Sequence, residues 1–201
     1  MSDPPSRPPR GERRRKILSA ARHLLQTAGP AALSLDEIAR VAGVSAAQLS
    51  RSFDSTAEVV QSIFDEYYEQ LTAELPELDE NDPVTRFHAQ TNHLYQQVRQ
   101  ASELRQLLLR LLAEPHQEFS RVVVGFLDQL TDLIEPTITA GQLVGVFRRT
   151  IKPRVAAAEW LHGFLGMLLI DQPSRSSLPQ SDATPAMWSD CFLHGLLKTD
   201  I

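Results

Sequence analysis

Residues 34–53, SLDEIARVAGVSAAQLSRSF, decide the fold of this 201-residue chain, because they predict two short helices joined by a tight turn. Ser34 followed by Glu37 is a capping-box start, in which the hydroxyl accepts a backbone N–H and the carboxylate reaches back to the cap. Gly43 is placed to end the first helix in a left-handed conformation, and Ser45 caps the second. Such a pair is a helix-turn-helix, whose second helix can enter the major groove of DNA.

The charge of the chain is divided between its two parts. Residues 1–51 hold nine Lys and Arg against four Asp and Glu, whereas residues 52–201 hold 11 against 21. The net charges of +5 and −10 together give the −5 of the whole chain. A basic head on an acidic body favours a polyanionic partner for the head, and the helix-turn-helix indicates that this partner is DNA. The alternative is a chance concentration of arginines in a disordered tail.

Further residues around the motif indicate a family. They are Ile17-Leu18-x-Ala20-Ala21, Leu24, Gly29, the run LSLDEIARVAGVS, Leu49 and Phe53. In this order and spacing, residues 17–60 resemble the DNA-binding domain of TetR-type transcriptional regulators. The resemblance implies an all-α protein with a three-helix DNA-binding head at 12–55 and a larger helical domain at 56–201 for effector binding and dimerisation. Residues 1–11 contain four prolines and are expected to be a disordered tail.

Apolar stripes at helical spacing predict the other helices. Their ranges are 12–28, 55–75, 83–100, 102–113, 115–135, 153–171 and 184–198, and Pro136 is expected to kink or end the fifth of them. The resemblance implies that the helix at 55–75 connects the head to the body. The helix at 153–171 is apolar on nearly all sides, which predicts burial on its own core and on a second subunit. Gly163 and Gly166 would let the partner backbone approach.

The head offers residues for base edges and for phosphates. Base contacts are expected from Ala46, Ala47, Gln48 and Arg51, with Ser45 and Ser50 nearer the phosphates. Phosphate contacts are expected from Arg14, Arg15, Lys16, Ser34, Arg40 and the helix start at Thr56, where free N–H groups can bind an anion. The amide of Gln48 can pair with adenine and alanine methyls suit thymine, which points to A·T-containing half-sites. The alternative is that Gln48 and Arg51 are solvated surface residues.

Two positions depart from the family pattern and keep two functions open. Where this chain has Ser50 and Thr56, the family usually has Tyr and Lys, which commonly touch DNA phosphates. The first hypothesis is a ligand-responsive transcriptional regulator, a repressor, that binds a roughly palindromic operator as a homodimer. The second is an all-α dimeric ligand-binding or interaction module that has lost specific DNA binding.

Two more groups of residues are assigned to effector binding and dimerisation. A helix face that mixes apolar and hydrogen-bonding groups can line a cavity for a largely apolar small molecule. Its residues are Phe87, His88, Thr91 and Tyr95, with Phe64, Tyr67, Phe126, Trp160 and Met167 as walls, although aromatic residues at this spacing also suit a core. The resemblance implies a homodimer through the last two helices of each chain. The residues assigned to it are Trp160, Leu161, Phe164, Leu165, Leu168, Trp188, Cys191 and Phe192.

An enzyme is the least favoured interpretation. Cys191 and His194 are three residues apart on one helix, which suits a nucleophile–base or metal pair, but no third ligand has a recognisable spacing. The sequence contains no glycine-rich phosphate loop or nucleophile elbow, so we expect no catalysis, no metal and no cofactor. One cysteine, the lack of a secretory signal and the lack of a convincing membrane span predict a cytoplasmic protein.

Overall fold

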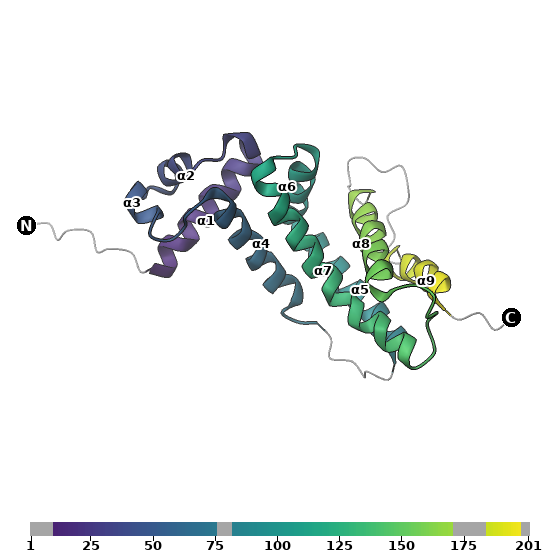
Figure 1. Cartoon of the computed structure of the whole chain (residues 1–201). Helices are drawn as coiled ribbons and strands as arrows, with labels where there is room; N and C mark the ends of the chain where they lie inside the picture. The colour runs from purple at the N-terminus through teal and green to yellow at the C-terminus, as the bar shows by residue number, and fades with distance from the viewer. Residues whose placement is uncertain (1–9, 76–81, 171–183, 198–201) are drawn as a thin grey trace, which may run out of the picture. The chain divides into compact units, whose positions relative to one another are not determined.

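The computed structural model describes residues 10–75, 82–170 and 184–197. These residues form helices α1 (Arg10–Thr27), η1 (Pro30–Ala32), α2 (Leu35–Ala42), α3 (Ala46–Leu49), α4 (Thr56–Thr72), α5 (Pro83–Gln100), α6 (Ser102–Ala113), α7 (Gln117–Leu143), α8 (Pro153–Ile170) and α9 (Thr184–Leu196) (Figure 1). In the described ranges the extended structure is an isolated antiparallel bridge between Phe147 and Leu197. None of the described helices is long and apolar enough to cross a bilayer. The predicted all-α fold class is confirmed.

The helices form two compact units. The first contains the described residues up to Tyr67 together with Gln106–Val123, so the end of α6 and the start of α7 join the helix-turn-helix. The second contains the described residues between Tyr68 and Arg105 and those from Val124 onward, which include α5, α8 and α9. The unit that carries the helix-turn-helix is therefore built from two segments that are distant in the sequence.

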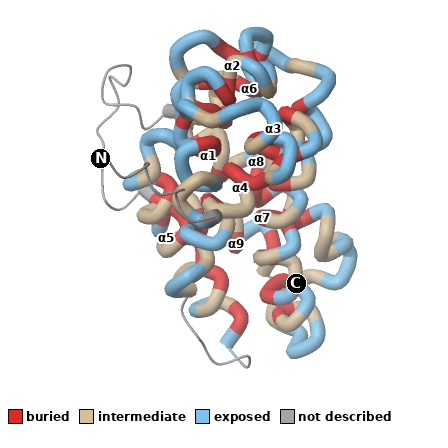
Figure 2. Tube along the Cα trace, turned by 90° about the vertical axis from the view of Figure 1, so that its left-hand side faces the viewer, coloured by how far each residue is buried: buried red, intermediate tan, exposed pale blue. Residues whose placement is uncertain are grey.

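Helix α1 is the central support of the first unit. Ile17, Leu18 and Ala21 are completely buried, as helical spacing of one apolar stripe predicts. Arg22 forms an ion pair with Glu66 of α4, and its guanidinium also lies 5.3 Å from the ring centre of Tyr67. Buried and exposed positions alternate along these helices, as Figure 2 shows in red and pale blue. Apolar packing and one charged contact thus hold α4 on α1.

Helix α7 continues through Pro136 to Leu143, so the predicted helix end at residue 135 is wrong. A proline inside a helix removes one backbone donor and costs about 3 kcal/mol. Ile134 and Ile138 are completely buried on either side of it, and each such burial stabilises by about 1.5–3 kcal/mol. The Thr137 hydroxyl also donates to Oε1 of Gln90 on α5, 2.7 Å away. These contacts offset the cost of the proline.

Several other boundaries differ from the sequence predictions by one to three residues. Helix α1 begins at Arg10, two residues earlier than expected, and α4 ends at Thr72 rather than at residue 75. The second helix of the motif ends at Leu49, and residues 50–52 form a turn. The Phe53 side chain is buried, and the Phe53 N–H donates to the Leu49 carbonyl at 3.0 Å, which closes the turn after the helix.

Candidate nucleic-acid interface

The turn between α2 and α3 is fixed by main-chain conformation. Gly43 has φ 65° and ψ 34°, the left-handed conformation that the sequence predicted. The N–H of Val44 donates to the carbonyl of Ala39 at 3.0 Å, which satisfies a carbonyl at the end of α2. A Cβ at Gly43 would meet nothing within 4 Å, so glycine is needed here for its backbone angle and not for space.

The N-terminus of α2 has only one of the two hydrogen bonds of the predicted capping box. The Ser34 hydroxyl accepts the N–H of Glu37 at 3.2 Å, as predicted. The Glu37 carboxylate does not reach back; both of its oxygens accept from the guanidinium of Arg40, at 2.8 and 2.5 Å. This hydrogen bonding lowers the pKa of Glu37 and raises the pKa of Arg40. A bidentate pair with a guanidinium one turn along the helix therefore takes the place of the contact between this carboxylate and the cap N–H.

The cap of α3 is a complete capping box that involves Gln48. The N–H of Gln48 donates to the Ser45 hydroxyl at 3.2 Å, and the N–H of Ser45 donates to Oε1 of Gln48 at 3.0 Å. The amide oxygen of Gln48 therefore stabilises the start of α3 when no DNA is bound. Pairing with both N7 and N6 of adenine uses the nitrogen and the oxygen of that amide, so Gln48 would have to share this oxygen with the cap or leave the cap.

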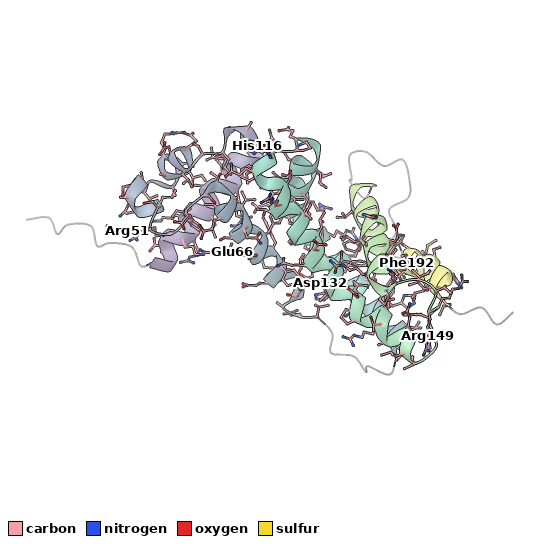
Figure 3. All side chains as sticks on the ribbon, viewed as in Figure 1. Arg51, Glu66, His116, Asp132, Arg149 and Phe192 are labelled. Carbon is pink, nitrogen blue, oxygen red and sulfur yellow. The ribbon has the colours of Figure 1, made fainter. Side chains whose placement is uncertain are left out.

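Most of the residues predicted to contact DNA lie on the surface. The exposed ones are Arg14, Arg15, Lys16, Ser34, Arg40, Ser45, Ala46, Ala47, Ser50 and Arg51. Gln48 is half-buried, and Thr56 is buried. Arg51 lies in the turn after α3 and is labelled in Figure 3. Within the described ranges it forms no ion pair, so its charge is available to a base edge or a phosphate.

The first turns of α1 add positive charge beside the motif. The Arg14 guanidinium lies 5.0 Å from the ring centre of Phe53, the residue that closes the turn after α3. Lys16 forms an ion pair with Glu12 at 3.0 Å. An open groove of about 740 Å³ between α1 and α2 is lined by Arg15 and Lys16 among others. Basic side chains thus border the exposed face of the helix-turn-helix, as binding of a polyanion requires.

The start of α4 is bonded to a residue far along the chain. Thr56 is 8% exposed, and its hydroxyl donates to Oε1 of Glu118 on α7. The N–H of Ala57 donates to the same oxygen at 3.2 Å. Arg110 of α6 makes the matching contact at the end of α1, where it donates to the carbonyl of Gln26 at 2.5 Å. Sequence analysis missed Glu118 and Arg110, because no local pattern marks a contact over such a separation.

The residues predicted for an effector pocket are divided between the two units. Phe64 and Tyr67 belong to the first, and the others to the second. All are buried except His88, which is half-buried; the set comprises Phe64, Tyr67, Phe87, Thr91, Tyr95, Phe126, Trp160 and Met167. Two polar groups lie among the apolar walls of the second unit. The Trp160 indole N–H donates to the Thr91 hydroxyl at 3.1 Å, and Nδ1 of His88 bonds the Ser189 hydroxyl at 2.7 Å.

The residues predicted for dimerisation pack first within their own chain. Aromatic contacts link them to the residues predicted for the effector pocket. Trp160 stacks on Phe164 and Phe192 stacks on Phe87, with ring centres 4.9 and 5.6 Å apart. The burial of the set falls into three groups: Trp160, Leu161 and Phe164 buried, Leu165, Trp188 and Phe192 half-buried, and Cys191 exposed. Leu168 belongs to α8, but its side chain lies outside the described ones.

The two glycines of α8 have different surroundings. A Cβ at Gly163 would lie 2.7 Å from Cζ2 of Trp188, so this glycine makes room for α9 of the same chain rather than for a partner backbone. The prediction for Gly163 is therefore corrected. Among the described residues, none lies within 4 Å of the would-be Cβ of Gly166, which leaves open the approach of a second helix.

A serine, a histidine and an acid meet between α5 and α9, but their geometry is not that of a nucleophile. Ser189 is 1% exposed, and its hydroxyl donates to the carbonyl of Ala186 at 2.9 Å. It therefore accepts from Nδ1 of His88, whose Nε2 lies 3.4 Å from Asp190. A catalytic serine must instead give its proton to the histidine and reach a substrate. The three residues tie α5 to α9.

Comparison with known proteins agrees with this geometry. Residues 17–63 match the family model of bacterial regulatory proteins of the tetR family. The structure is similar to that of native NalD, the secondary repressor of the MexAB-OprM multidrug efflux pump in Pseudomonas aeruginosa (TM-score 0.72, 22% identity, 94% of this chain and 98% of that chain covered). It is also similar to SmeT in complex with triclosan (TM-score 0.69, 18% identity, 93% and 92% covered).

A third structure of this fold is a protein from Saccharomonospora viridis in complex with choline (TM-score 0.64, 20% identity, 94% and 100% covered). A sequence search of curated proteins found no match. The matched family is one of bacterial regulatory proteins and NalD is a repressor, which is the non-enzymatic class that the sequence predicted. Residues 17–63 therefore belong to the TetR family of bacterial regulatory proteins, and the chain that carries them has the TetR-like fold.

Proposed function

We propose that this protein is a transcriptional repressor that binds a roughly palindromic operator as a homodimer. The observation that carries the proposal is the exposed face of α3 and the following turn, with Gln48 and Arg51, beside the basic side chains of α1. Arginine and glutamine can read base edges in the major groove, whereas the α1 cations neutralise phosphates. Two such heads on a two-fold axis would enter successive major grooves about one helical turn apart.

The second unit supplies the reason to expect an effector. Its interior places the Trp160–Thr91 hydrogen bond and the polar group of His88 among aromatic walls, which suits a small, largely apolar molecule. Proteins of the same fold are known with triclosan and with choline. The effector would bind the dimer more tightly at one distance between its two DNA-binding heads than at another. It would thereby change DNA affinity by a coupling free energy of about 1–3 kcal/mol.

Homodimerisation is supported by the outer side of α8 and α9. Val155 on α8 and Met187 on α9 are exposed by 50% and 64%, and Cys191 is exposed on the same helix as Met187. Gly166 offers space for a close helix crossing. Burial of these apolar groups against a second copy would stabilise the dimer by roughly 25 cal/mol per Å².

Selection of bound fragments from random DNA by the purified protein tests the proposal. We expect a palindromic consensus with A·T pairs in each half-site, and an affinity that falls steeply as salt rises. The double variant Gln48→Ala, Arg51→Ala should lose the consensus, whereas Arg105→Ala on α6 should keep it. Binding that is insensitive to the double variant would remove the base-reading assignment.

The second candidate function, a dimeric binding module without specific DNA binding, is favoured by two observations. Thr56 is turned inward, and the Ser50 hydroxyl donates to the carbonyl of Ala47 at 3.4 Å. The two positions where the family usually has Tyr and Lys therefore offer DNA little. Absence of any enriched sequence at low salt, from a folded dimer, would favour this candidate.

A further inference from the structure

The start of α4 holds an anion that the chain itself supplies. Oε1 of Glu118 accepts from the Thr56 hydroxyl and from the N–H of Ala57, 3.2 Å away. The first-turn N–H groups of a helix have no partner within the helix and carry a partial positive charge. A carboxylate bonded there has the position and the sign of charge that a phosphate takes at a helix N-terminus.

Two neighbouring donors at this helix end also have acceptors. The N–H of Glu58 donates to the Ser55 hydroxyl at 3.1 Å, and the N–H of Asp54 donates to Oε2 of Glu58 at 2.6 Å. An additional anion that bonds the Thr56 hydroxyl or the Ala57 N–H would thus have to displace Glu118 from that donor. Glu118 differs from the local caps in one respect, because it comes from the first turn of α7 and is itself exposed. Rotation of one side chain, or a small shift of α7, is enough to release it.

We propose that Glu118 makes an autoinhibitory contact: in the protein without DNA it occupies the first turn of α4, and it competes there with a phosphate of the DNA backbone. This inference rests on the proposed DNA-binding function and concerns its regulation. A phosphate can bind Thr56 and Ala57 only after the carboxylate withdraws. A movement of α7 that withdraws Glu118 would therefore raise DNA affinity, and one that holds it in place would lower DNA affinity.

The test compares two isosteric changes that each remove one negative charge. Glu118→Gln removes the charge at the start of α4, and Glu69→Gln removes an exposed charge near the other end of the same helix. DNA affinity is measured on the selected operator and on random duplex across a salt series. We expect Glu118→Gln to bind about three- to tenfold more tightly than Glu69→Gln at low salt, with a salt slope steeper by about one phosphate contact.

Amide hydrogen exchange reports the contact without DNA. In the Glu118→Ala variant the Ala57 amide should exchange faster than in the wild type, whereas the Val59 amide, whose acceptor is the Ser55 carbonyl at 3.3 Å, should change little. Equal exchange at Ala57 in both proteins would overturn the inference. Circular dichroism and the melting temperature check that each variant is folded.

The DNA measurements separate failure of this inference from failure of the proposed function. One outcome would overturn the autoinhibitory contact alone. In it the wild type and Glu118→Gln both bind DNA, and their affinity and salt slope equal those of Glu69→Gln. A lower affinity of Glu118→Gln would overturn it as well, because it would mean that Glu118 supports the DNA-bound form. Folded proteins of all three kinds that bind no DNA at low salt would overturn the proposed function, and the inference with it.

Discussion

The indole N–H of Trp160 on α8 donates to the hydroxyl of Thr91 on α5 at 3.1 Å, and both side chains are completely buried. This hydrogen bond satisfies the one polar atom of the largest fully buried side chain. It also places a polar pair among the aromatic rings of the second unit. The contact therefore supports the packing of α5 on α8 and, under the proposed function, the walls of an effector site.

Thr91→Val should destabilise the protein. Valine fills the same space but leaves the indole N–H of Trp160 buried without its acceptor, which costs about 1–3 kcal/mol. Urea unfolding followed by tryptophan fluorescence measures the change. Thr139→Val, at an exposed position of α7, is the control and should stay close to the wild type. Equal stabilities of the two variants would show that another acceptor replaces Thr91.

Gly163→Ala and Gly166→Ala should have opposite effects on the monomer fold. The added methyl group at position 163 would lie 2.7 Å from the Trp188 ring, and such overpacking costs about 1–3 kcal/mol. At position 166 the methyl group meets none of the described residues within 4 Å, so alanine should stabilise the helix by up to about 1 kcal/mol. Thermal unfolding compares the two. Weaker dimerisation of Gly166→Ala in sedimentation would place this residue at the interface, and equal melting temperatures would contradict the packing of Trp188.

Gln48→Glu should separate the two roles of Gln48. Glutamate at this position keeps the capping box with Ser45, so the melting temperature should change little. The carboxylate lacks the amide donor and repels phosphates, so DNA affinity should fall about tenfold or more. Fluorescence anisotropy with the selected operator measures this loss. Retained affinity would show that Gln48 stays in the cap when DNA binds.

Asp82 should make stability depend on pH in the acid range. Hydrogen bonding to Thr85 lowers the pKa of Asp82 from its ordinary value of 3.8, and the carboxylate accepts the Thr85 N–H at 3.0 Å as the cap of α5. The unfolded chain therefore binds this proton more readily than the folded chain. The stabilisation is present above the unfolded pKa and is lost as pH falls through the lower, folded one.

Asp82→Ser tests this dependence, because serine also caps a helix but does not titrate in this range. The wild type should lose more thermal stability than Asp82→Ser between about pH 5 and pH 2. Parallel melting curves over that range would show that the charge of Asp82 contributes nothing to the cap.

The sequence by itself determined the helix-turn-helix. The cap at Ser34, the left-handed Gly43 and the cap at Ser45 lie where the pattern placed them. Each depends on a hydrogen bond or a backbone angle within about four residues, and a pattern of that length is readable from sequence. The apolar stripe of α1 was readable for the same reason, because its period is that of the helix.

Only the tertiary structure decided those features that depend on contacts between residues far apart in the sequence. Thr56 turned inward because Glu118, 62 residues away, bonds it, and Thr91 became part of a buried pair because Trp160 lies 69 residues away. Helix α7 passed through Pro136 because the burial of its neighbours outweighs the lost hydrogen bond. Local patterns measure local preferences, whereas these outcomes depend on which distant side chains share one interior, and that is settled only when the helices pack.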